Sequence, residues 1–164
     1  MRERRAFTLI EMLVVVLIIM VLATIVMVTM YSSKDKANYS RIVSDMEVLA
    51  KAARMYESTS DRYPYDVAGG VLPAEMSAYM SSSAMPQPPC GHYDYESDRY
   101  VSGSSVLAST YWTGSGITMR KSDAASTFYY YYPLTSNFSH INPTQEPGIN
   151  ILTTTDKSIS CAGI

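Results

Sequence analysis

The feature that most constrains this chain is an apolar run near its N-terminus, from Phe7 to Met30. As a helix with about 1.5 Å rise per residue, this run would be roughly 36 Å long, against about 30 Å for the hydrocarbon core of a bilayer. Arg2, Arg4 and Arg5 precede it. Because basic residues beside a span stay in the cytoplasm, we expect the segment to cross a membrane with the rest of the chain on the far side.

One acidic residue, Glu11, separates this run from an ordinary membrane segment. A secretory signal would have a shorter apolar region, and a plain signal anchor needs no carboxylate. An acidic side chain at mid-helix costs about 2.5 to 3.5 kcal/mol on the lenient insertion scale, so Glu11 requires a partner. Cleavage before Phe7 would create an α-amine with a pKa of about 8, and this amine would pair with the Glu11 of a neighbouring subunit.

The residues around this carboxylate carry a family resemblance. The order Ala6-Phe7-Thr8-Leu9-Ile10-Glu11 resembles the prepilin-type N-terminus of the type IV pilin superfamily, which usually has glycine where this chain has Ala6. The resemblance implies that a membrane prepilin peptidase cuts between Ala6 and Phe7 and N-methylates Phe7. It also implies that Glu11 guides subunit registration during filament assembly.

Beyond the apolar run the pattern becomes amphipathic, with apolar residues three and four positions apart. These are Tyr39, Ile42, Met46, Leu49, Ala53 and Tyr56. They form one helical stripe, and no Pro or Gly interrupts the chain from Phe7 to Glu57, which predicts one continuous helix of about fifty residues. The stripe would hold the head at a fixed position along the helix, or it would simply face the core of the head as in an ordinary globular protein. A coiled-coil dimer is a third alternative, although alanines would provide little of the apolar contact between its helices.

This stretch is similar, without gaps from Phe7 to Pro64, to the G-class major pseudopilin of type II secretion. The matching residues are Lys34 to Ala37, Ser44-Asp45, Met55-Tyr56 and Asp61 to Pro64. The turn from Met85 to Gly91 is similar to the turn before that class's first strand. Val28 stands where family helices often have proline, so we expect a straighter helix.

The last hundred residues are rich in Ser, Thr, Tyr, Pro and Gly, and they alternate short β-prone runs with turn formers. The expected strands are Gly91 to Tyr95, Tyr100 to Ser102, Val106 to Trp112, Ile117 to Arg120, Thr127 to Tyr132 and Ile149 to Thr155, preceded by a short helix within Ala74 to Ser82. The predicted fold class is α+β, a pilin fold whose long N-terminal helix packs against a small antiparallel sheet. The predicted organisation is a leader (1–6), a membrane and filament-core half-helix (7–30), an amphipathic half-helix (31–58) and a head (59–164).

Four consecutive tyrosines, Tyr129 to Tyr132, lie in one of these runs. Alternation along a strand places Tyr129 and Tyr131 on one face and Tyr130 and Tyr132 on the other. One pair should then meet either a neighbouring subunit or loops of the same chain.

The two cysteines, Cys90 and Cys161, both fall in the part expected to be exported, where a disulfide can persist. Bonded, they would close a loop of about 70 residues, worth roughly 4 kcal/mol in the chain-entropy model. The alternative is two unpaired thiols.

The remaining candidate chemistry is a metal site. Asp94, Glu96 and Asp98 alternate and would share one face of a strand, which suits a hard cation such as calcium. A solvated acidic edge is the alternative, and the spacing does not fit an EF-hand loop. No nucleophile elbow, phosphate-binding loop or paired catalytic acids are present, so we expect no enzyme and no cofactor.

The net charge of −2 becomes −4 without the leader, since three Arg and one Glu are lost from 13 basic and 15 acidic residues. Nucleic-acid binding is therefore not expected. The predicted function is a structural subunit of a type IV pilus-like filament, either a pilus or a secretion pseudopilus, made from copies of the chain at an inner-membrane assembly platform. Before assembly the subunit would sit in membrane lipid with its head in the periplasm. The alternatives are a minor, DNA-capturing competence pilin and a membrane-anchored enzyme.

Overall fold

The structure, a computed structural model, describes residues 8–102, 104–109, 111–122, 127–141, 148–150 and 157–161. Its dominant element is the helix α1 (Leu9–Ser60) of 52 residues. The helical backbone continues through Val28, and it ends where Asp61 adopts a left-handed conformation with φ of 55° and donates its N–H to the Glu57 carbonyl at 2.9 Å. The expected continuous helix is confirmed.

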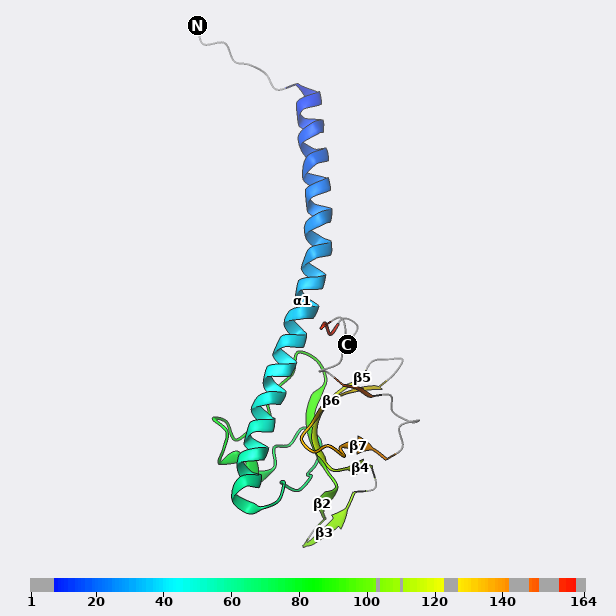
Figure 1. Cartoon of the computed structure of the whole chain (residues 1–164). Helices are drawn as coiled ribbons and strands as arrows, with labels where there is room; N and C mark the ends of the chain where they lie inside the picture. The colour runs from blue at the N-terminus through cyan, green and yellow to red at the C-terminus, as the bar shows by residue number, and fades with distance from the viewer. Residues whose placement is uncertain are drawn as a thin grey trace.

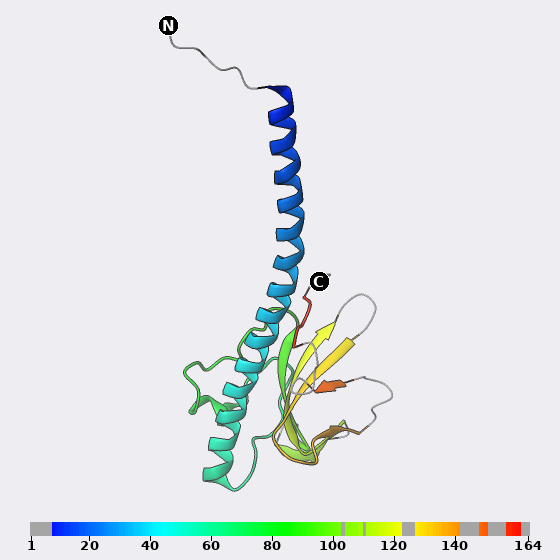
Figure 2. The same cartoon turned by 45° about the horizontal axis from the view of Figure 1, so that its top comes forward.

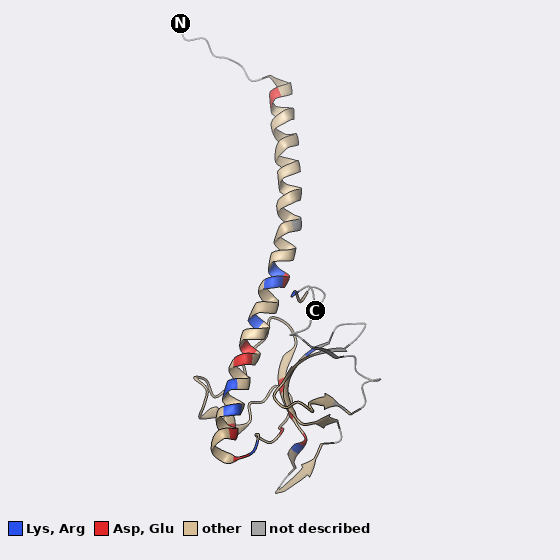
Figure 3. Ribbon diagram, in the orientation of Figure 1, with Lys and Arg blue, Asp and Glu red and all other residues tan. Residues whose placement is uncertain are grey.

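The two halves of α1 have different surroundings (Figure 1). The first half projects beyond the head, and its large apolar side chains from Leu9 to Met30 are 46–83% exposed wherever they are described. Figure 3 shows that charged residues are confined to the second half apart from Glu11 at the start. Helix α1 is long and apolar enough to cross a membrane, judged by its length and composition.

The head is built from one short helix and eight strands in the described residues. They are α2 (Ala74–Ser77), β1 (His92–Ser97), β2 (Arg99–Ser102), β3 (Ser105–Ala108), β4 (Trp112–Thr113), β5 (Ser115–Ser122), β6 (Thr127–Pro133), β7 (Ser139–His140) and β8 (Gly148–Asn150). The expected run from Val106 to Trp112 is divided, because it supplies β3 to one hairpin and β4 to another pairing.

The main sheet has the order β1-β5-β6-β8, while β2–β3 and β4–β7 form separate two-stranded sheets. Antiparallel pairing is confirmed for β1–β5 and β5–β6, but β8 lies parallel to β6, against the expectation of a wholly antiparallel sheet. A parallel neighbour needs a long return connection, and the segment between β6 and β8, which includes β7, provides one.

The core lies between the second half of α1 and one face of the main sheet (Figure 2). Four members of the predicted stripe are buried, and Tyr39 packs at its edge. These four are Ile42, Met46, Leu49 and Ala53, and they lie in one cluster with Tyr93, Tyr95, Ile117 and Met119 of the sheet. The predicted stripe is therefore the face of α1 that packs against the sheet, and it joins the helix to the head.

The opposite face of the sheet is covered by the chain itself. Tyr131 makes edge-to-face contacts with Trp112 and Phe138, whose rings stack 5.1 Å apart. Gly116 makes room for this cluster, because a Cβ there would clash with the Phe138 ring. Tyr130 and Tyr132 pack against the core, as alternation predicts. For Tyr131, cover by loops of the same chain is the correct alternative.

Candidate functional site

Glu11 occupies the first turn of α1, where it closes a capping box with Thr8. Its Oε2 accepts hydrogen bonds from the Thr8 backbone N–H and from Thr8 Oγ1, both at 2.8 Å, and the Glu11 N–H donates to Thr8 Oγ1 at 3.4 Å. These bonds satisfy donors that a helix start otherwise leaves unpaired. Ala6 and Phe7, the predicted cleavage site, lie outside the described residues.

The capping role was missed in reading the sequence, although its signal was present. A Thr followed three residues later by Glu, before an apolar run, is the signature of a capping box. Glu11 therefore has a hydrogen-bond partner within its own chain. Its carboxylate is held at the helix start with an orientation set by Thr8.

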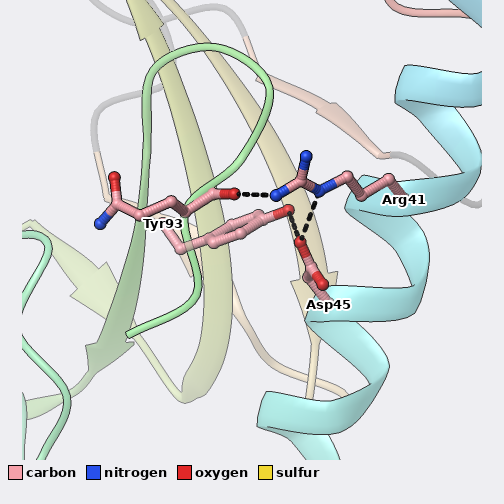
Figure 4. Close-up of polar contacts among 4 residues, drawn as sticks. Arg41, Asp45 and Tyr93 are labelled. Atoms are coloured by element: carbon pink, nitrogen blue, oxygen red, sulfur yellow. Dashed lines mark hydrogen bonds and ion pairs between the residues drawn. The ribbon is translucent and has the colours of Figure 1, made fainter. Parts of the chain in front are cut away.

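A polar contact joins the second half of α1 to the head (Figure 4). Tyr93 of β1 donates its hydroxyl to Asp45 Oδ2 at 2.9 Å, and Arg41 Nε lies 3.8 Å from the same oxygen. Arg41 also donates to the Gln87 carbonyl at 2.8 Å. Burial and the Asp45 carboxylate both raise the pKa of Tyr93, so this hydroxyl stays protonated and remains a donor.

The C-terminal segment forms a second contact with α1. Ile159 is buried, its N–H donates to the Asp35 carbonyl at 3.0 Å, and its own carbonyl accepts from the Asn38 side chain at 3.3 Å. The predicted disulfide between Cys90 and Cys161 is confirmed, and it holds this segment beside the start of β1. The chain end is thereby tied to both the helix and the sheet.

The three metal candidates do not form a site. Asp94 is half-buried, Glu96 is buried and accepts from Thr118 Oγ1 at 3.4 Å, and Asp98 is exposed beyond the end of β1. Across the described parts of the chain, no three His, Cys, Asp or Glu side chains are grouped closely enough to hold a metal ion.

The carboxylate of Asp94 instead repels that of Asp66, which lies in the segment that follows α1. Asp66 is held by backbone bonds to β2, with its N–H donating to the Arg99 carbonyl at 2.9 Å. Burial and the nearby Asp94 charge raise the pKa of Asp66 to about 7, while burial raises the pKa of Asp94 to about 6 despite the charge of Arg120. Asp94 Oδ1 is buried without a hydrogen-bond partner in the described structure, which penalises the ionised form.

The stability of the head should consequently depend on pH. Both carboxyls have pKa values raised above an unfolded value of about 3.9, so the folded state binds protons more tightly. The free energy of unfolding should be highest near pH 4 and fall by about 2 kcal/mol as pH rises through 7, less than the full shifts imply because both groups keep some contact with water. Denaturant titrations of the chain in detergent between pH 4 and 8 would measure this.

Two variants isolate the effect. Asp66→Asn should flatten the profile, whereas Glu47→Gln, at an exposed position of α1, should leave it unchanged. A wild-type stability that rises from pH 5 to 8 would contradict the assignment to these two carboxyls.

Comparison with known proteins finds a family match at the N-terminus of the chain. Residues 1–27 match the family described as "Prokaryotic N-terminal methylation motif". No solved structure was found to match the chain.

Several curated proteins described as "Type II secretion system core protein G" are similar to part of the chain. The protein from Klebsiella pneumoniae is 41% identical over 64 residues, which cover 39% of this chain and 46% of that protein. The Escherichia coli K12 protein is 40% identical over 62 residues, covering 38% and 43%. That of Vibrio cholerae El Tor Inaba N16961 is 38% identical over 64 residues, covering 39% and 44%. The chain thus spans less than half the length of these curated relatives.

Proposed function

We propose that this type IV pilin-like chain, homologous over part of its length to type II secretion core protein G, is a pseudopilin: a structural subunit that adds to a helical filament at the inner membrane. Its role is mechanical rather than catalytic. The observation that carries the proposal is the unbroken α1, whose first half is apolar and exposed and whose second half is packed into a head.

An exposed apolar surface of this size needs a non-aqueous environment. Large contiguous apolar patches on a soluble protein mark contacts with a membrane or with other proteins. The first half of α1 would lie in lipid before assembly and among the same half-helices of other copies afterwards. The same side chains suit both environments, because lipid tails and packed apolar helices are similarly apolar.

Glu11 would change partners between these states. In the single subunit its carboxylate accepts two hydrogen bonds from Thr8. Removal of residues 1–6 by a prepilin peptidase would place a charged α-amine at Phe7, and a neighbour's Glu11 would neutralise this amine in the filament core. An ion pair in an apolar setting strongly favours one register, since a displaced subunit leaves both charges unpaired.

The orientation follows from the charges at the N-terminus. Arg2, Arg4 and Arg5 would hold the leader in the cytoplasm, where the peptidase and the assembly platform meet it, and the head would face the periplasm. The disulfide suits that oxidising compartment. The similarity to core protein G favours a secretion pseudopilus over a pilus.

The variant Glu11→Gln tests this proposal with unusual selectivity. Glutamine can close the same capping box with Thr8, but it carries no charge. In cells with a prepilin peptidase and assembly platform, mass spectrometry should find both wild type and variant beginning at methylated Phe7. Filament yield of the variant should fall at least about tenfold, because only the intersubunit charge pair is lost.

Two results would oppose the proposal. A mature wild-type N-terminus other than methylated Phe7 would contradict the proposed cleavage and methylation. Normal filament yield from Glu11→Gln would contradict the intersubunit charge pair and leave Glu11 with only the role of capping its own helix. Glu47→Gln, which removes an exposed carboxylate from the second half of α1, is the matched control for loss of one charge.

A further inference from the structure

The head contains a pocket, lined by both polar and aromatic residues, that the filament role does not use. It has a volume of about 420 Å³ and lies where four separate segments meet. Its lining includes the residues after α1, the β1–β2 junction, the β4–β5 turn and the turn after β6, represented by Arg62, Tyr65, Arg99, Ser115 and Asn137. A pocket of this size accommodates a small organic ligand.

Arg62 is fixed in the wall of this pocket by aromatic contacts. Its guanidinium lies 4.0 Å from the centre of the Tyr65 ring and 5.2 Å from that of Tyr56. One nitrogen donates to the Tyr63 carbonyl at 3.3 Å. A guanidinium has five N–H donors, so most remain available on a group that is already ordered and loses little freedom on binding.

Arg99 is a second arginine in the lining of the same pocket. It is exposed, its backbone N–H donates to Ser97 Oγ at 3.4 Å, and within the described residues its guanidinium has no ion pair or hydrogen bond. The acidic residue in the lining is Asp98, whose carboxylate accepts a hydrogen bond from Ser97 at 3.4 Å. Two positive groups and one negative group leave the pocket with a net positive charge.

The floor of the pocket provides shape rather than free donors. The Ser115 N–H already donates to Thr135 Oγ1 at 2.9 Å, and Thr135 Oγ1 lies 3.4 Å from the Ser115 carbonyl. Gly114, with φ of 70°, permits the close approach of Thr135 and Asn137, where a Cβ would clash. The donor groups in the described lining are therefore chiefly those of the two arginines, the Asn137 carboxamide and the tyrosine hydroxyls.

We propose that this pocket binds a carboxylate, held between Arg62 and Arg99 with Asn137 as an additional donor. Planar guanidinium groups match carboxylates through paired, charge-assisted hydrogen bonds, which are about twice as strong as neutral ones. The carboxylate belongs either to a polypeptide end or to an acidic sugar, and both would present the same planar anion.

The test uses the full-length chain in detergent micelles with ¹⁵N-labelled arginine. Four probes are titrated: acetyl-dialanine with a free carboxylate, its amide, glucuronate and glucose. The side-chain N–H signals of Arg62 and Arg99 should shift with at least one carboxylate probe and not with its neutral counterpart. A shift with the peptide acid alone identifies a polypeptide end, a shift with glucuronate alone identifies an acidic sugar, and shifts with both show that the carboxylate suffices.

Charge variants give opposite expected effects. Arg99→Gln should weaken binding about tenfold, and Arg62→Lys should also weaken it, because lysine keeps the charge but loses the planar fork. Asp98→Asn should tighten binding several-fold by removing a competing anion. Arg54→Gln, an exposed arginine of α1 outside the pocket, should change nothing.

The proposal is overturned if no carboxylate probe shifts either arginine. It is equally overturned if the amide and glucose bind as well as the acids, or if Arg54→Gln weakens binding as much as Arg99→Gln. Because Asp98 and Arg99 are exposed, their variants are expected to fold normally, so a loss of binding reports on the pocket.

Discussion

Replacing Cys90 and Cys161 together with serine is expected to lower the free energy of unfolding by about 4 kcal/mol. The disulfide joins residues 71 positions apart, so its loss frees a long loop of the unfolded chain. It also releases the C-terminal segment, whose Ile159 is buried against α1 and bonded to the Asp35 carbonyl. Equilibrium denaturation of the wild type and the double variant under oxidising conditions would measure the difference.

Reduction supplies the control for this prediction. A reductant should destabilise the wild type by a similar amount and leave the double-serine variant unaffected. Hydrogen exchange at the Ile159 amide should accelerate in the variant, because its bond to α1 would open locally. A loss below about 1 kcal/mol would show that the remaining contacts of the segment hold it without the crosslink.

The second large effect is expected from Ile42→Ala, which should cost about 3 kcal/mol of stability. Ile42 is 0% exposed and lies in the core cluster between α1 and the sheet. Its truncation removes buried apolar contacts and leaves a cavity that the surrounding side chains fill incompletely. Denaturant unfolding followed by circular dichroism would measure the cost.

Val48→Ala is the matched control, because valine and isoleucine are both β-branched and both lie in the middle of α1. Val48 is 50% exposed, so its truncation should change stability by less than about 0.5 kcal/mol. Equal losses from the two variants would contradict the orientation of the stripe toward the sheet. If Val48→Ala keeps its stability as expected, filament assembly of this variant would report on the outward face of α1, because the fold is unchanged.

The contacts between α1 and the head have a mechanical consequence. The apolar stripe, the contact of Arg41 and Asp45 with Tyr93, and the docking of Ile159 join the second half of α1 to separate parts of the head. A force applied to the first half of the helix would therefore move the head with it. The filament role proposed above would require this coupling, since assembly would act on the helix while the head would form the outer surface.

Much of this arrangement was evident in the sequence because it depends on local patterns. An uninterrupted apolar run with one acid predicted α1 and singled out Glu11, and apolar residues at helical spacing predicted the buried face of Ile42 and Met46. Two cysteines in a region expected to be exported made the disulfide a reasonable expectation. Periodicity and composition are properties of residues that lie close together in the chain, so they can be recognised in a single sequence.

What the tertiary structure decided involves residues that are distant in the chain. The parallel pairing of β8 with β6, the Asp66–Asp94 interaction and the pocket between Arg62 and Arg99 each join segments whose separation follows no period. Strand alternation predicted that the three metal candidates share one face. In the folded protein, however, Glu96 is buried and accepts a hydrogen bond from Thr118, while Asp98 is exposed to solvent. The sequence by itself determined the helix, its membrane-length half and its acidic start, because backbone bonding and apolar periodicity are local. Only packing decided which polar groups of the head meet, because burial and charge pairing arise after distant segments come together.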